Sequence, residues 1–168
     1  MPDGNSMKGN ELVVRADLSR YRRPRALESH YQSLWFTLVR SHWTSLVLVP
    51  ADEGDSAAGI ATALADVGRR LRKTPVTFLV MAGSIDYASA GKFVSEVAGK
   101  GGQASDGPPT SRVIIAVPPV IVEPLALAVT DAADAVALYV RKGSTHSDAA
   151  ARTIELVGRE RIMGCVLA

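Results

Sequence analysis

A short turn at residues 51–56 carries the side chains with the clearest chemical potential. An apolar run at 45–50 enters the turn, which reads Ala-Asp-Glu-Gly-Asp-Ser, and a helix rich in small residues follows at 57–71. A strand, turn and helix of this kind bind phosphate when glycines let backbone N–H groups approach and a Lys followed by Ser or Thr supplies charge. Gly54 and Ser56 are present, but Asp55 stands where the lysine would be.

The carboxylates of this turn oppose phosphate binding. Asp52 and Glu53 add two negative charges to that of Asp55. Two like charges about 4 Å apart repel each other by roughly 4 kcal/mol at an effective dielectric of about 20. The three acids could ligate a divalent cation, or they could favour the helix dipole and cap its N–H groups. We expect the second role, with Ser56 as a helix cap and not a nucleophile.

Strands and helices alternate along the chain, which predicts how this turn is positioned. Leu27, Tyr31, Leu34 and Leu38 recur at helical spacing, so an amphipathic helix is expected over about 25–40. Apolar runs predict strands, and helical patterns separate them; the strands are expected at 45–50, 76–81, 113–117, 135–140 and 161–167. The pattern predicts a three-layer α/β domain over 24–168, with about five mostly parallel strands and helices on both faces.

Other segments are expected to be less regular. Residues 1–23 are predicted to form a loose arm, and the Gly- and Pro-rich stretch 99–111 is predicted to be a surface loop. Ser144 or Thr145 is placed to cap a helix that runs to about residue 157.

The composition excludes several functions. The formal net charge of +2 is too small to indicate nucleic-acid binding, and the three histidines have no metal-ligand spacing. The single cysteine, Cys165, cannot form a disulfide within the chain and lies in an apolar run, so we expect a buried, inert thiol. No apolar run approaches the ~20 residues of a membrane-spanning helix, and a cytoplasmic location is expected.

Three segments in this order resemble the bacterial tyrosine kinases that work with chain-length co-polymerases in polysaccharide export. The turn and helix at 50–71 resemble the family's phosphate loop. The run Val-Ile-Ile-Ala-Val-Pro-Pro-Val at 113–120 resembles its second motif, an apolar strand followed by Asp-Thr-Pro-Pro. The stretch 132–143 and the end of the chain at 164–168 resemble later strands. The resemblance covers about residues 24–168 and implies a P-loop NTPase-like fold, related to the MinD-like and ParA-like ATPases.

The departures from the family pattern imply lost catalysis. Asp55 replaces the loop lysine, and Ala116, followed by Pro118 and Pro119, replaces the acid that the family uses to hold magnesium and water. The strand at 76–81 matches either the family's Asp-x-Asp strand or its later Pro-Ala-Gly strand; no Asp pair remains in either case. Phosphoryl transfer depends on charge neutralisation and positioning. We therefore expect no catalytic residue, no bound cofactor and no metal.

The resemblance implies a role in exopolysaccharide or capsule synthesis and export through protein–protein interaction. The implied partner is a membrane chain-length co-polymerase or another export protein. This partner would bring the protein to the inner-membrane surface. A homo-oligomer is a further expectation. The alternatives are an atypical ATPase or tyrosine kinase, and a localisation scaffold of the MinD or ParA type. In the family's oligomerisation motif, Glu-x-x-Arg-x-x-Arg, both arginines are replaced here. The predicted partner surface is therefore apolar and consists of Tyr31, Leu34, Trp35 and Leu38. The competing arrangement packs these residues onto their own sheet.

Overall fold

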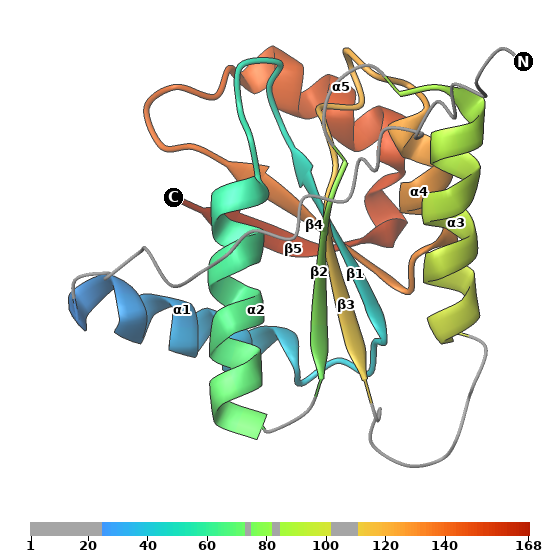
Figure 1. Ribbon diagram of the computed structural model, residues 1–168. Helices are drawn as coiled ribbons and strands as arrows, with labels where there is room; N and C mark the ends of the chain where they lie inside the picture. The colour runs from blue at the N-terminus through green and yellow to red at the C-terminus, as the bar shows by residue number, and fades with distance from the viewer. Residues whose placement is uncertain (1–24, 73–74, 82–84, 102–110) are drawn as a thin grey trace, which may run out of the picture.

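Five parallel strands form one sheet in the order β2-β3-β1-β4-β5 (Figure 1). The computed structural model describes residues 25–72, 75–81, 85–101 and 111–168. The strands are β1 Ser45–Pro50, β2 Val76–Val80, β3 Arg112–Ala116, β4 Ala135–Val140 and β5 Ile162–Leu167. The helices are α1 Arg25–Leu38, α2 Ala58–Arg72, α3 Tyr87–Gly101, α4 Ala126–Ala132 and α5 Ser147–Val157. The predicted α/β fold with five parallel strands is confirmed.

The central strand β1 lies between β3 and β4. Leu48 is paired with Ala116 on one side and with Ala137 on the other. All six residues of β1 and all five of β3 are buried, as expected of parallel strands covered on both faces. Because β1 is parallel to both neighbours, the carboxyl ends of β1, β3 and β4 lie at the same edge of the sheet, where the connecting segments begin.

Helices α1 and α2 cover one face of the sheet (Figure 1). Trp35 and Leu38 are 0% and 5% exposed and belong to the core on this face. Tyr31 and Leu34 are half-buried and pack against the same core. The expectation that Trp35 and Leu38 face a partner is therefore corrected. Trp35 and Leu38 pack instead onto their own sheet, because the apolar side of α1 is covered by the sheet and by α2.

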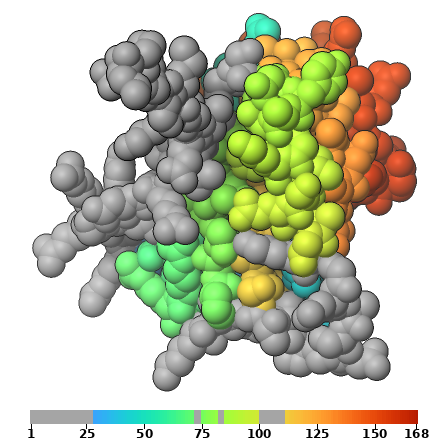
Figure 2. Space-filling model, turned by 45° about the vertical axis from the view of Figure 1, so that its right-hand side comes forward, coloured from blue at the N-terminus to red at the C-terminus, as the bar shows by residue number. Residues whose placement is uncertain are grey.

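Helices α3, α4 and α5 cover the opposite face, and Figure 2 shows them side by side as one layer. Phe93 and Val97 of α3 and Val129 of α4 pack against the strand residues that point to this side. Val157 at the end of α5 completes the layer. Helix α3 extends to Gly101, which corrects the expectation that a loop begins at residue 99; residues 102–110 of that predicted loop lie outside the described residues.

Strand β5 forms an edge of the sheet and pairs with β4 alone. Its pairing is irregular between Val136 and Ala137, and most of its residues are exposed. Cys165 is exposed, which corrects the expectation of a buried thiol. An apolar run predicts a strand, but it does not predict that the strand lies at the edge of a sheet with little cover.

Two further expectations concern the chain ends and helix caps. The arm at 1–23 lies outside the described residues. Neither Ser144 nor Thr145 caps α5, since the N-cap is His146 and its own side chain makes no capping hydrogen bond. The hydroxyl of Thr145 is used elsewhere, as described below.

Among the helices that the structure describes, none has both the length and the hydrophobicity needed to cross a bilayer.

Candidate functional site

The turn after β1 and the loop after β4 lie against each other at the carboxyl edge of the sheet. The two strands are neighbours, with Pro50 paired with Tyr139, and the Ala51 N–H continues the pairing to the Tyr139 carbonyl at 2.9 Å. In open parallel sheets the crevice at this edge is the usual ligand site. The turn at 51–56 is thus where a phosphate site would be expected, and its neighbour is the loop at 141–146.

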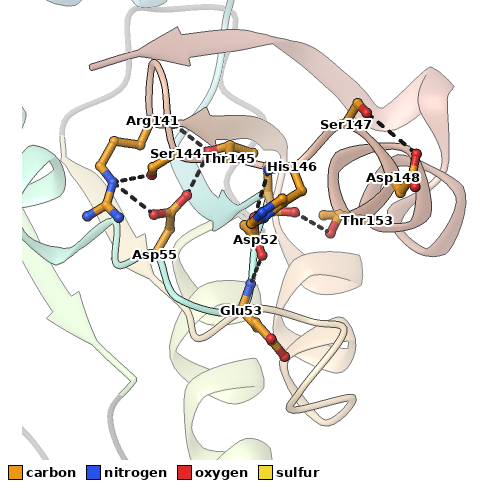
Figure 3. Close-up of polar contacts among 11 residues, drawn as sticks. Asp52, Glu53, Asp55, Arg141, Ser144, Thr145, His146, Ser147, Asp148 and Thr153 are labelled. Atoms are coloured by element: carbon orange, nitrogen blue, oxygen red, sulfur yellow. Dashed lines mark hydrogen bonds and ion pairs between the residues drawn. The ribbon is translucent and has the colours of Figure 1, made fainter.

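The Asp52 carboxylate accepts three hydrogen bonds, and two of them join it to His146 at the start of α5. The carboxylate accepts from the Glu53 N–H at 2.7 Å, from the His146 N–H at 2.7 Å and from His146 Nδ1 at 2.7 Å (Figure 3). Asp52 is buried, with 7% of its surface exposed, whereas the His146 side chain is 82% exposed. The backbone and ring of His146 lower the pKa of Asp52, and the Asp52 carboxylate raises the pKa of His146.

These contacts explain how α5 begins without a cap of its own. The first N–H groups of a helix have no partner within the helix and need an acceptor from outside. His146 occupies the N-cap position in extended geometry, and its N–H points to the Asp52 carboxylate. An acid from the turn after β1 thus binds the start of a helix that lies 94 positions later in the chain.

Asp55 is bound by the other end of the same loop. Its side chain is 2% exposed and accepts a hydrogen bond from the Thr145 hydroxyl at 2.7 Å. The Arg141 Nε lies 3.2 Å from the carboxylate and also 2.6 Å from Ser144 Oγ. Asp55, which the resemblance places at the lysine position of a phosphate loop, is therefore a buried acid whose counter-charge comes from this chain. We call Asp52, Asp55, Arg141, Thr145 and His146 the clasp (Figure 3).

Several N–H groups of the turn already have acceptors within it. The Glu53 N–H is bound by the side chain of Asp52, and the Asp55 N–H by the Asp52 carbonyl at 3.2 Å. The Ala58 N–H approaches Ser56 Oγ at 3.4 Å, in agreement with a capping role for Ser56 at the start of α2. A phosphate loop needs backbone N–H groups that point to its ligand. The N–H groups of Glu53 and Asp55 instead donate to acceptors within the turn.

Residues 116–119, which resemble the family's second motif, lie beside the turn but offer no ligand at Ala116. Ala116 ends β3 next to Leu48 of β1, is 2% exposed and belongs to the core under α2. Its methyl side chain has no oxygen that could hold a metal ion or a water molecule. Pro118 and Pro119 follow it and are half-buried. The fold thus brings the end of β3 beside the end of β1, and Ala116 offers no acid there.

An open pocket of about 510 Å³ adjoins the clasp. It is bounded by Asp52 and Glu53 from the turn, by Ile121, and by the start of α5; its α5 residues are His146, Asp148, Ala149 and Arg152. Within the part of the chain that the structure describes, no three His, Cys, Asp or Glu side chains are arranged to hold a metal ion. Acids and bases are mixed around the pocket, so its charge selects no ligand class.

The sequence interpretation identified the acids but missed their partners. Arg141 lies in the stretch that resembles a later strand of the family, Thr145 was predicted only as a helix cap, and His146 was noted only for its lack of metal-ligand spacing. One signal could have found them, because they directly follow a strand that was itself predicted. Parallel strands end at the same edge of a sheet, so the loop after each predicted strand was a candidate.

The comparisons with known proteins add no relative to this description. No protein-family model matches the chain, and no curated protein is similar to it in sequence. The fold is compatible with a P-loop-like domain, and the membership suggested by the resemblance stays a prediction.

Proposed function

We propose that this chain is a catalytically inactive relative of the bacterial tyrosine kinases and acts by binding a partner protein. The observation that carries the proposal is the environment of Asp55. At the position of the phosphate-binding lysine, a carboxylate is buried and is already bound by Arg141 and Thr145. A nucleotide phosphate at this turn would meet negative charge in place of positive charge.

The loss of charge at two positions supports inactivity more strongly than either would alone. Catalysis of phosphoryl transfer rests on a cation that neutralises the phosphates and on an acid that holds magnesium. Asp55 removes the first, and Ala116 removes the second. The resemblance assigns the partner to polysaccharide synthesis and export, with a membrane chain-length co-polymerase as the first candidate; a fold by itself would not specify this process.

The proposal is tested by the effect of ATP and magnesium on unfolding. A ligand at 100 times its Kd stabilises the folded state by about 2.7 kcal/mol. We expect millimolar ATP with magnesium to leave the melting temperature unchanged, and calorimetry to detect no binding. A micromolar affinity or a clear ATP-dependent rise in melting temperature would favour the atypical ATPase or kinase instead.

A single reversion provides the second test. Asp55→Lys restores the loop cation but leaves Ala116 without an acid and exposes Arg141 to a second positive charge. We expect Asp55→Lys to be less stable than the wild type and to hydrolyse no ATP. Hydrolysis by this single variant would show that the remaining site is functional.

A further inference from the structure

We propose that the clasp is a built-in lock that replaces a nucleotide: it holds the turn after β1 and the start of α5 in one arrangement with no ligand bound. This inference rests on the proposed function and specifies its regulation. If partner binding uses this edge of the sheet, the binding surface is permanently formed and is not switched by nucleotide.

The contacts of the clasp join both ends of one loop to one turn. Asp55 holds Arg141 and Thr145 at the beginning of the loop and near its end, while Asp52 holds His146. The pairs are separated by about 90 residues in sequence, so they form only when the sheet is assembled. Releasing Asp55 leaves the loop held only through His146, and releasing Asp52 leaves it held only through Arg141 and Thr145.

The two acids are linked through the loop itself. Thr145 Oγ1 accepts the Arg141 N–H at 2.8 Å while its hydroxyl donates to Asp55. The Thr145 N–H returns to the Arg141 carbonyl at 3.0 Å, and His146 follows directly. Hydrogen bonds in such a chain polarise and strengthen one another. We therefore expect the contacts of Asp55 with Arg141 and Thr145 to open together with the contacts of Asp52 with His146.

The charges of the clasp balance without a ligand. In a phosphate loop the protein supplies the cation and the nucleotide supplies the anion. Here the chain supplies both, with carboxylates at Asp52 and Asp55 and cationic groups at Arg141 and, when protonated, His146. A ligand shifts a conformational equilibrium only when it binds the two states differently. Because the side chains of the clasp already hold the turn in one conformation, a nucleotide would have no second conformation to favour.

Hydrogen exchange measured by mass spectrometry on the full chain tests the lock. Asp52→Ala and Asp55→Ala are compared with Glu53→Ala, whose exposed side chain lies in the same turn and makes no hydrogen bond or ion pair with the clasp residues. We expect either clasp variant to raise amide exchange about tenfold or more in both 51–57 and 141–149, since one lost buried hydrogen bond is worth about that factor. Glu53→Ala should leave both segments unchanged.

The outcomes separate the lock from the proposed function. If Asp52→Ala loosens only 146–149 and Asp55→Ala only 141–145, the acids act independently and the lock is overturned. Should Asp55→Ala fail to fold, Asp55→Asn, which keeps the shape and loses the charge, gives the same comparison. Wild-type protein with ATP and magnesium is a separate arm: protection of 51–57 there would refute the proposed inactivity, while the variants without ATP still report on the lock.

Discussion

The indole of Trp35 in α1 lies directly over Gly68 in α2. A Cβ added at Gly68 would come within 2.5 Å of Trp35 Cη2 and within 2.8 Å of two further ring carbons. Trp35 also packs edge-on against Trp43, with ring centroids 6.1 Å apart. The absence of a side chain at Gly68 thus allows α1 to approach α2 closely, and it gives Trp35 its place in the core.

Gly68→Ala should therefore destabilise the protein although alanine is the better helix former. We expect a loss of about 1–3 kcal/mol in the free energy of unfolding, because a rigid indole must shift within a packed core. Gly59→Ala is the matched control on the same helix, where an added Cβ meets nothing within 4 Å. It should be neutral or stabilise by up to about 1 kcal/mol. Urea titration followed by circular dichroism measures both, and equal effects would contradict the close contact.

Trp35→Ala should act on stability and not on assembly. Truncation of a buried Trp is expected to cost about 3–5 kcal/mol, because Trp35 is 0% exposed. Phe36→Ala, one position along the same helix at 53% exposed, should change stability by about 0.5 kcal/mol or less. Light scattering should give the same molar mass for wild type and Trp35→Ala. A dimer that dissociates on Trp35→Ala without loss of stability would restore the interface interpretation.

The pair of His146 and Asp52 predicts a dependence of stability on pH. Because the Asp52 carboxylate raises the pKa of His146 above its ordinary value, the unfolded chain loses the His146 proton first as pH rises. The stabilisation is therefore complete below about pH 6.5 and is lost as pH rises through the folded-state pKa. The charged groups around the ring are Asp52 and Glu53 from the turn, and Asp148 and Arg152 from α5.

Unfolding of wild type and His146→Gln between pH 5 and pH 9 measures this effect. The difference in stability between the two proteins should be larger at pH 6 than at pH 8.5. His42→Gln, at an exposed histidine outside the clasp, is the matched control for the effect of a His-to-Gln substitution itself. A difference that grows as pH rises would show that His146 is stabilised in its neutral form.

Asp134 predicts a second dependence, on the acid side. Burial raises the pKa of Asp134, but hydrogen bonds from Thr44 and Ser45 outweigh this and lower it overall. The carboxylate accepts the Thr44 N–H at 2.8 Å and the Ser45 N–H at 3.1 Å, and also binds the Thr44 hydroxyl. Since the folded-state pKa is depressed, the stabilisation is present above about pH 4 and is lost as pH falls through that pKa.

Asp134→Asn removes the charge and keeps a side-chain acceptor. We expect Asp134→Asn to lower the free energy of unfolding at pH 7 by about 1–2 kcal/mol. Between pH 5 and pH 2 the variant should lose less stability than the wild type loses. Asp131→Asn is the control, because Asp131 is an exposed acid three positions earlier that pairs with Arg161. An equal effect of the two substitutions would contradict the special role of Asp134.

The exposure of Cys165 predicts ready chemical labelling. Because the thiol lies on the uncovered edge strand β5, iodoacetamide should modify the native protein at a rate of the same order as the denatured protein. Mass spectrometry should show one added group, since the chain has one cysteine. Protection of the thiol until denaturant is added would show that another segment or a second molecule covers β5.

The sequence by itself determined the elements of this fold. The continuous apolar runs at 45–50, 113–117 and 135–140 are buried strands in the structure, because strands covered on both faces need no polar residue along their length. The helical stripe around Tyr31 and Leu34 was visible in the same way. These signals are local, so a reading of neighbouring residues recovers them.

The tertiary structure alone decided what each element faces. Nothing near Asp52 or Asp55 indicates that β4 lies beside β1, because strand order depends on the packing of all the crossovers at once. That order pairs Asp52 with His146 and Asp55 with Arg141, and it gives the acidic turn its counter-charges. The packing of α1 on α2 places Trp35 against Gly68 in the core, and the strand order leaves Cys165 on the edge strand β5. Contacts between distant segments carry the chemistry of this site, and they exist only in the assembled sheet.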